Sequence, residues 1–308
     1  MEIHQLNYFI AVAETGGFSR AARRCHVAQP SLSQQIMKLE QELGQQLFDR
    51  LGRTVTLTEA GQALLPHARA VLMEVQAIKH GLVDRIEAGY GRLNVGFIPT
   101  IAPFLLPGVL RQFAEQFPQA ELSVHEDLTD ALIRDLVSGK LDVGIMSLPI
   151  NNKLIETEEL FTEPLLVASS RQRNWIKKAL IRTKDLEEFP FIALNEVHCL
   201  GEQVQAFCYQ QDVNLEIVCY TSQLSTVQSC VAFGLGISLV PEMLAATDTS
   251  EQVQYYAISD DTPRRRIVAA SHSGRLSSWL SQQFTELVRE EYRRLASNFN
   301  DQTGDSNE

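Results

Sequence analysis

Cysteine thiols are the side chains of this sequence with the most distinctive chemistry. The 308 residues contain five of them, Cys25, Cys199, Cys208, Cys219 and Cys230. Their number is odd, and no CxxC pair or Cys/His cluster has the spacing of a zinc site, so we expect neither a structural disulfide framework nor a metal or cofactor site. A small buried hydrophobic residue is the default for each cysteine. We expect that default for Cys25, Cys219 and Cys230.

Cys199 is placed where a thiol can become reactive. It follows a strand predicted over residues 191–194, precedes a helical stretch predicted over residues 202–209, and has His198 directly before it. The thiolate is the reactive form of cysteine, and a helix N-terminus and a nearby histidine both lower the pKa of a thiol. Cys208 lies nine residues further along the chain. That separation alone favours two ordinary cysteines that never bond, because it defines no thiol motif.

Alternating strand and helix patterns surround these cysteines. Strands are predicted over residues 93–98, 121–125 and 141–145, with helices over 104–117 and 129–138 between them. A second set of strands is predicted over residues 165–169, 191–194, 218–220 and 236–240, and a last helix over 277–295. This alternation predicts an α/β domain with parallel strands and helices on both faces of the sheet.

We expect this domain to sense a signal and to span residues 91–296 in two α/β subdomains. Subdomain I comprises residues 91–163 and 267–296, subdomain II comprises residues 164–266, and a flexible polar tail comprises residues 297–308. Two such subdomains imply a cleft in which a ligand meets strand ends and helix N-termini. Thr100 and Thr129 each begin a predicted helix at the cleft, where helix capping and ligand binding are equally good explanations.

Residues 1–58 are predicted to form a winged helix-turn-helix. A first amphipathic helix is followed by a short helix over residues 19–26, a tight turn and a third helix. The third helix has an apolar stripe formed by Leu32, Ile36, Leu39 and Leu43. Its outer face carries residues that suit the major groove of DNA, and we expect these residues to bind DNA: Gln29, Pro30, Ser31, Ser33, Gln34 and Lys38.

A wing is predicted directly after the third helix. Residues 51–58 alternate as a hairpin does, and Arg50 and Arg53 are expected to contact DNA phosphates. The alternative for the N-terminal segment is a plain three-helix bundle with a solvated polar face.

Residues 59–90 are predicted to form one long linker helix, bent at Pro66. Its apolar residues step alternately by four and three positions, a heptad seam that a single helix cannot bury alone. We therefore expect this helix to pair with a second copy of the chain through Leu64, Ala68, Val71, Val75, Ile78 and Leu82. Such a homodimer would suit two-fold DNA sites.

The distribution of charge is consistent with this division. The net charge is −11, yet residues 1–90 carry nine basic and nine acidic side chains, so the whole excess lies in residues 91–308. A modest basic cluster in the first fifty-odd residues is the expected footprint for DNA. The sequence has no run of apolar residues long enough to span a membrane and no signal peptide, so we expect a cytoplasmic protein without membrane contact.

The N-terminal sequence resembles a known family. The segment AARRCHVAQPSLSQQIMKLEQELGQQLFDR, followed by LTEAG, is similar to the LysR-type transcriptional regulators, and LDVGI and VAFGLGISLVP resemble strands of that family's effector domain. The resemblance covers nearly the whole chain. It implies a winged helix-turn-helix, a dimer through the linker helix, a periplasmic-binding-protein-like sensing domain, assembly into a homotetramer, and contact with RNA polymerase.

The segment around Cys199 resembles the redox segment of peroxide sensors of the OxyR type. The residues that carry this resemblance are His198-Cys199-Leu200-Gly201-Glu202-Gln203 and Phe207-Cys208. The resemblance implies that Cys199 attacks hydrogen peroxide, that Cys208 resolves the product as a disulfide, and that a thiol reductant resets it. It also implies that Thr100, Thr129, His198 and Arg266 surround the peroxide. Gly201 departs from the pattern, which has an arginine at this position.

Helix geometry indicates that a Cys199–Cys208 disulfide would change the structure of the segment between the two cysteines. Nine residues of α-helix separate two Cα atoms by about 13 Å, whereas a disulfide requires about 7 Å or less. Bond formation would therefore unwind the segment and turn a two-electron oxidation into a conformational switch.

Three other functions are weighed against a peroxide-switched regulator. The chain could be a LysR-type regulator that binds a small organic co-inducer in the cleft between the subdomains. It could be a thiol peroxidase that uses Cys199, but a DNA-binding segment has no purpose in such an enzyme. It could be a solute-binding protein, but the sequence has no signal peptide. We expect a transcriptional regulator and not an enzyme.

Overall fold

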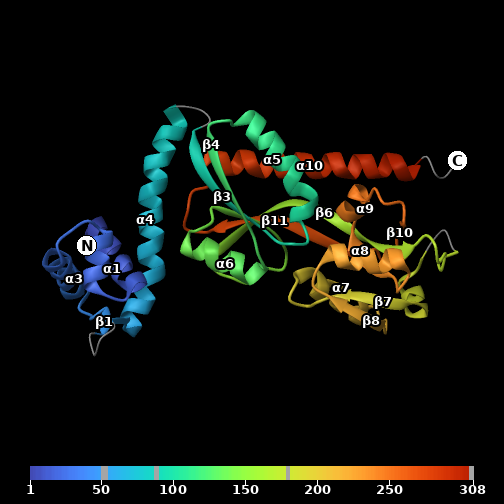
Figure 1. Cartoon of the computed structure of the whole chain (residues 1–308), viewed down its shortest axis with the longest axis horizontal. Coiled ribbons are helices and arrows are strands. Elements are labelled where there is room, and N and C mark those ends of the chain that lie inside the picture. Colours follow the sequence, from blue (N-terminus) through green and yellow to red (C-terminus); the bar gives the residue numbers. More distant parts are fainter. Residues whose placement is uncertain (50–54, 87–89, 178–180, 305–308) are drawn as a thin grey trace. The chain divides into compact units, whose positions relative to one another are not determined.

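The computed structural model describes residues 1–49, 55–86, 90–177 and 181–304, with side chains described outside 78–86, 298 and 300–304. The chain divides into two compact units, one built mainly from α1 to α4 and the other from β3 to α10. Figure 1 labels the elements. Among the described residues, no helix combines the length and the apolar character of a membrane span.

The first unit contains the predicted helix-turn-helix and linker helix. Its elements are α1 (Ile3–Thr15), α2 (Phe18–Arg24), α3 (Gln29–Leu43), β1 (Phe48–Asp49), β2 (Thr56–Leu57) and α4 (Glu59–Ile86). Gly16 and Gly44 end α1 and α3 in the left-handed conformation, and Pro30 lies in the first turn of α3. The antiparallel pairing of Phe48 with Leu57 forms the base of the predicted wing. Arg50 and Arg53 lie outside the described residues.

One apolar core holds the first unit together. Phe9, Leu32, Ile36 and Leu39 are fully buried in it. Leu43 was expected to continue the stripe of α3, but it is 40% exposed, because the helix ends there and the chain turns away at Gly44.

The linker helix contributes to the same core, which corrects part of the predicted seam. Ala68 is buried in the core of its own domain and is not free for a partner, whereas Leu64 packs against that core and stays partly exposed. Val71 is 40% exposed and Val75 is partly exposed. The side chains of Ile78 and Leu82 lie outside the described residues.

The second unit is an α/β structure with two apolar cores. Elements of the first half are β3 (Gly91–Phe97), α5 (Ala102–Gln116), β4 (Ala120–Glu126), α6 (Thr129–Ser138), β5 (Val143–Ser147) and β6 (Ile155–Ser170). The middle contains η1 (Thr183–Glu188), β7 (Pro190–Leu194), α7 (Cys199–Gln210), β8 (Glu216–Thr221) and α8 (Leu224–Phe233). The last elements are β9 (Ser238–Pro241), α9 (Glu242–Thr247), β10 (Val253–Tyr256), β11 (Arg264–His272) and α10 (Trp279–Gly304).

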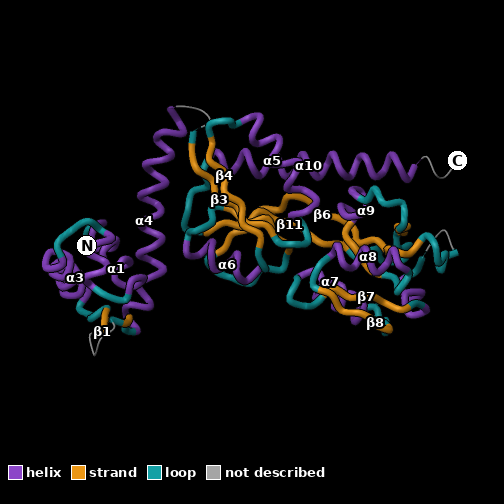
Figure 2. Tube along the Cα trace, in the orientation of Figure 1, coloured by secondary structure: helices purple, strands orange, loops and turns teal. Residues whose placement is uncertain are grey.

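The sheets are mixed, whereas we expected parallel strands. The larger sheet has the order β10-β6-β11-β5-β3-β4, with β9 also paired to β6, and the smaller sheet pairs β7 with β8. β3, β4 and β5 are parallel, as are β7 and β8, but β6 and β11 run antiparallel to each other and to their other neighbours. The reason is that the chain passes from one core to the other along β6 and returns along β11 (Figure 2).

Helices cover both faces of the sheet, as expected. In Figure 1, α5 and α10 lie on one side of β3 and α6 lies on the other. The core of subdomain I contains residues of β3, α5, α6, β5 and α10, and the core of subdomain II contains residues of β7, α7, α8 and β9. The tail expected from residue 297 is instead helical through Gly304, because no proline or glycine interrupts α10 before that position.

Candidate functional site

Cys199 is the first residue of α7, where the backbone places it at a helix N-terminus. His198 is the N-cap residue, with extended backbone angles. The turn from β7 is closed by hydrogen bonds from His198 N to Asn195 O at 3.1 Å and from Gly201 N to His198 O at 2.9 Å. The predicted helical stretch is confirmed, and it includes both Cys199 and Cys208.

Gly201 lets the first turn of α7 pack directly on the end of β7. A Cβ atom at this position would lie 2.6 Å from Asn195 O and 2.7 Å from Leu194 O. Those contacts are with backbone, which cannot rotate away as a side chain does. An arginine at this position, as in the redox pattern, would therefore not fit while α7 keeps this packing.

The thiol of Cys199 reaches across to subdomain I. Its side chain packs against the core of that subdomain and is hydrogen-bonded to the side chain of Thr129, the first residue of α6. The positive charge of Arg265 acts on the same thiol. The structure thus brings Cys199, Thr129 and Arg265 together from three different elements.

Arg265 is the centre of a buried polar cluster. Its Nε donates to Glu163 Oε1 at 2.6 Å, Nη1 donates to Thr100 Oγ1 at 3.0 Å, and Nη2 donates to Thr100 O at 3.1 Å. Glu163 Oε2 accepts from Met243 N at 3.2 Å. The side chains of Arg265 and Glu163 are completely buried, so each ion depends on the other for compensation of its lost hydration.

The arginine predicted for the site, Arg266, was the wrong member of the run 264–266. Its side chain is 60% exposed, and its Nη1 lies 3.8 Å from Glu159 Oε2. Successive residues of a strand point to opposite faces, and β11 alternates exposed, buried and exposed over these three arginines. Arg265 therefore occupies the interior position next to Thr100.

Burial and electrostatics act in opposite directions on the pKa of Cys199. Burial raises the pKa of the thiol, while Arg265, the Thr129 hydroxyl and the backbone N–H of Leu200 lower it. Burial prevails, so the pKa lies above its ordinary value. The thiol is protonated at neutral pH in this conformation, which contradicts the expectation that the helix N-terminus and His198 would leave it lowered. His198 itself is buried.

Gln203 is a member of the site that sequence reasoning did not single out. It lies one helical turn after Cys199, and its Nε2 donates to Ser147 Oγ at 2.9 Å and to Leu148 O. Its Oε1 is buried and, among the described residues, accepts no hydrogen bond. Residues four apart share a helix face, so that spacing from Cys199 was a usable signal. Gln203 Oε1 can accept a hydrogen bond from a small hydroxyl-bearing molecule.

Cys208 lies on the same helix as Cys199 but in the other core. It is buried among the residues of subdomain II, and burial raises its pKa to about 11. Both thiols are free. With a rise of 1.5 Å per residue, their Cα atoms are about 13 Å apart, so they cannot bond while α7 is intact.

The polar residues predicted to bind DNA lie on one part of α3. Gln29, Pro30, Ser31, Gln34 and Lys38 are exposed, and Ser33 is partly exposed.

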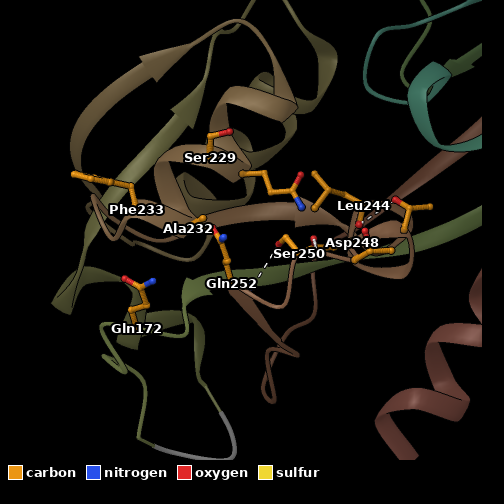
Figure 3. A pocket seen from close by; sticks show the side chains of 11 residues that line it. Gln172, Ser229, Ala232, Phe233, Leu244, Asp248, Ser250 and Gln252 are labelled. Carbon is orange, nitrogen blue, oxygen red and sulfur yellow. Dashed lines mark hydrogen bonds between the residues drawn. The ribbon is translucent and has the colours of Figure 1, made fainter.

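A separate pocket lies within subdomain II (Figure 3). It has a volume of about 560 Å³ and is bounded by α8, α9 and the segment that leads into β10. Its lining includes Gln228, Asp248 and Gln252, and the Tyr255 hydroxyl donates to Asp248 Oδ2 at 2.6 Å. The predicted site residues are not among those that line it.

Both units of the chain match known protein families. Residues 3–62 match the bacterial regulatory helix-turn-helix protein, lysR family, and residues 88–293 match the LysR substrate binding domain. The chain belongs to the LysR family. The predicted fold class, and the expectation of a regulator and not an enzyme, are thereby confirmed.

Relatives of this LysR-family chain include two curated activators. The chain is 35% identical over 291 residues to the hydrogen peroxide-inducible genes activator of Dickeya chrysanthemi, covering 94% of this chain and 95% of that protein. It is 35% identical over 290 residues to the DNA-binding transcriptional dual regulator OxyR of Escherichia coli, with the same coverage. A solved structure of a full-length OxyR variant from Pseudomonas aeruginosa superposes with a TM-score of 0.71 at 30% identity, covering 95% of each chain.

Proposed function

We propose that this LysR-family regulator activates transcription in response to hydrogen peroxide, through a reversible disulfide between Cys199 and Cys208. The observation that carries the proposal is the position of Cys199, on a helix N-terminus against Thr129 and the buried Arg265. The names of the curated relatives support the signal, because the Dickeya chrysanthemi protein is a hydrogen peroxide-inducible genes activator.

Peroxide would be held beside the thiol by groups that complement it. Hydrogen peroxide both donates and accepts hydrogen bonds. Gln203 Oε1 is a buried acceptor without a partner among the described residues, and the Thr129 hydroxyl and Arg265 supply donors. Thr100 accepts two hydrogen bonds from the Arg265 guanidinium and acts on the site by positioning that arginine. We assign His198 the role of N-cap to the reactive turn.

The chemistry is a two-electron oxidation in two steps. The Cys199 sulfur loses its proton and attacks one peroxide oxygen, which breaks the O–O bond, gives a sulfenic acid and releases water. The Cys208 thiol then attacks the sulfenic sulfur and releases a second water as the disulfide forms. A thiol reductant reverses the change by exchange. Arg265 favours the first step, because its charge stabilises the developing thiolate.

The raised pKa of Cys199 sets the conditions for this reaction. Because the resting thiol is protonated, the fraction of reactive thiolate at neutral pH is small. The disulfide then requires α7 to unwind, with Cys199 leaving the core of subdomain I or Cys208 leaving the core of subdomain II. Oxidation therefore selects a second arrangement of the sensing domain.

The first unit would transmit that change to DNA. We assign Gln29, Pro30, Ser31, Ser33, Gln34 and Lys38 of α3 to the major groove. Val71 and Val75 remain available for pairing with a second α4. The expected assembly is a cytoplasmic homodimer or homotetramer on two-fold promoter DNA that contacts RNA polymerase.

Thiol mass mapping tests the proposal. The purified full chain is treated with a near-stoichiometric amount of hydrogen peroxide, beside Cys199→Ser and Cys208→Ser variants. We expect a Cys199–Cys208 crosslink in the parent chain and in neither variant, with a changed DNA footprint of the oxidised form. If the Cys199 and Cys208 thiols are both still free after treatment, the redox mechanism is wrong. That result would favour a regulator that binds an organic co-inducer in the cleft.

A further inference from the structure

Cys219 and Cys230 were expected to be separate core residues, but the structure makes them neighbours. Cys219 lies on β8 and Cys230 on α8, and both pack against the core of subdomain II. The alternation of β8 leaves Val218 and Tyr220 exposed, so Cys219 points toward the half-buried side of the strand. Helix α8 packs on β8. Cys230 is itself only partly buried.

The two thiols interact with each other. The Cys219 and Cys230 side chains are hydrogen-bonded to each other, and the Cys219 thiol also lies 3.8 Å from Tyr220 O. Among the described residues, no group of three or more His, Cys, Asp and Glu side chains could hold a metal ion. Two adjacent, partly exposed thiols without further ligands have the composition of a dithiol redox site.

We propose that Cys219 and Cys230 form a second dithiol–disulfide site, which is oxidised by small-molecule disulfides and reduced by thiols, independently of Cys199. Because the two side chains are within hydrogen-bonding reach on elements that already pack together, the bond requires rotation of the side chains, and no helix has to unwind. This site would report the thiol–disulfide balance of the surroundings, a different quantity from the peroxide sensed in the proposed function.

Exchange with a disulfide RSSR takes two steps. The Cys219 thiolate attacks one sulfur of RSSR and forms a mixed disulfide, and the departing thiolate takes up the proton that Cys219 lost. Cys230 then loses its proton and attacks the Cys219 sulfur, and a second RSH leaves. The protein gives up two electrons and two protons, and RSSR becomes two RSH.

The order of the two cysteines follows from their surroundings. Burial raises the pKa of Cys230, and the neighbouring Cys219 sulfur raises it further. The raised pKa of Cys230 suits it to the second, resolving step. Cys219 is suited to the first attack.

The test uses the full chain with Cys199→Ser and Cys208→Ser, so that the first pair cannot contribute. The reduced protein is incubated with excess oxidised glutathione, alkylated and mapped by mass spectrometry. We expect a Cys219–Cys230 crosslink with the loss of two hydrogens, and complete loss of that crosslink when Cys219→Ser or Cys230→Ser is added. Cys25, a partly buried thiol in the other unit, is the internal control and should give at most a mixed disulfide.

Binding of phenylarsine oxide to the parent chain is a second measurement, which needs no serine variant. Phenylarsine oxide bridges two thiols only when they are adjacent, so it should bind one equivalent of the parent chain and protect Cys219 and Cys230 together from alkylation. Persistent glutathione adducts on Cys219 or Cys230 without a crosslink, or no joint protection by the arsenical, would overturn the proposal. Neither result depends on how Cys199 reacts with peroxide.

Discussion

The two cysteine pairs of the sensing domain differ in what separates their sulfur atoms. Cys199 and Cys208 share one helix, and their side chains belong to the two different cores. Cys219 and Cys230 lie on a strand and a helix that pack together in one core, and their side chains are hydrogen-bonded. The first pair can bond only by dismantling structure, whereas the second can bond within it. A disulfide of the second pair would therefore stabilise the fold, whereas a disulfide of the first pair would reorganise it.

The largest effect is expected when the charge beside the first pair is removed. Arg265→Met leaves Glu163 buried without its partner, and we expect a loss of about 3–5 kcal/mol in the free energy of unfolding, measured by chemical denaturation. Under native conditions the Cys219–Cys230 crosslink should be unaffected. Adding Glu163→Gln should recover part of the loss. A loss below about 1 kcal/mol would mean that the ion pair does not hold the fold.

The second pair should stabilise the chain when it is oxidised. In the Cys199→Ser and Cys208→Ser background, a Cys219–Cys230 bond closes a short loop, and we expect a gain of about 3 kcal/mol in the free energy of unfolding, seen as a higher melting temperature. In a Cys219→Ser and Cys230→Ser background, oxidation should instead link Cys199 to Cys208. The backbone amides of α7 should then be less protected from hydrogen exchange. Equal gains from both disulfides would remove the contrast between the pairs.

The packing of α7 can be loosened at Gly201. In Gly201→Ala the new Cβ meets backbone oxygens of Leu194 and Asn195, so we expect a destabilisation of about 1–3 kcal/mol and faster formation of the Cys199–Cys208 crosslink. The crosslink between Cys219 and Cys230 should form at its usual rate. Ala206→Ser, at an exposed position of the same helix, is the matched control. A slower Cys199–Cys208 reaction in Gly201→Ala would contradict the idea that this packing restrains the switch.

The smallest effect concerns the protonation of Cys199. Because its pKa is raised, the thiolate fraction increases with pH, and the alkylation rate of Cys199 should rise about tenfold per pH unit through the neutral range. Thr129→Val should lower the rate about fivefold, the equivalent of roughly one hydrogen bond, and Thr129→Ser should restore it. A rate that is already constant below neutral pH would show a lowered pKa.

Local patterns in the sequence predicted much of this architecture. The helix N-terminus at Cys199, the helical segment up to Cys208 and the exposed polar face of α3 follow from spacing within single elements. Details that depend on register or on distant contacts did not follow. Arg265 and Arg266 exchange places if a strand shifts by one residue, and nothing local distinguishes them. The contact of Cys219 with Cys230, and the burial of Ala68 in its own domain, arise only when separate elements pack.

The glycine at the start of α7 also constrains how this protein can change over generations. A single base change converts a glycine codon to an arginine codon, so Gly201→Arg, which would restore the arginine of the redox pattern, is within easy genetic reach. The carbonyl groups of Leu194 and Asn195 nevertheless occupy the space that any side chain would need. An arginine at this position therefore requires the end of β7 to move. Two backbone oxygen atoms thus limit which residues can occupy the first turn of the helix that begins at Cys199.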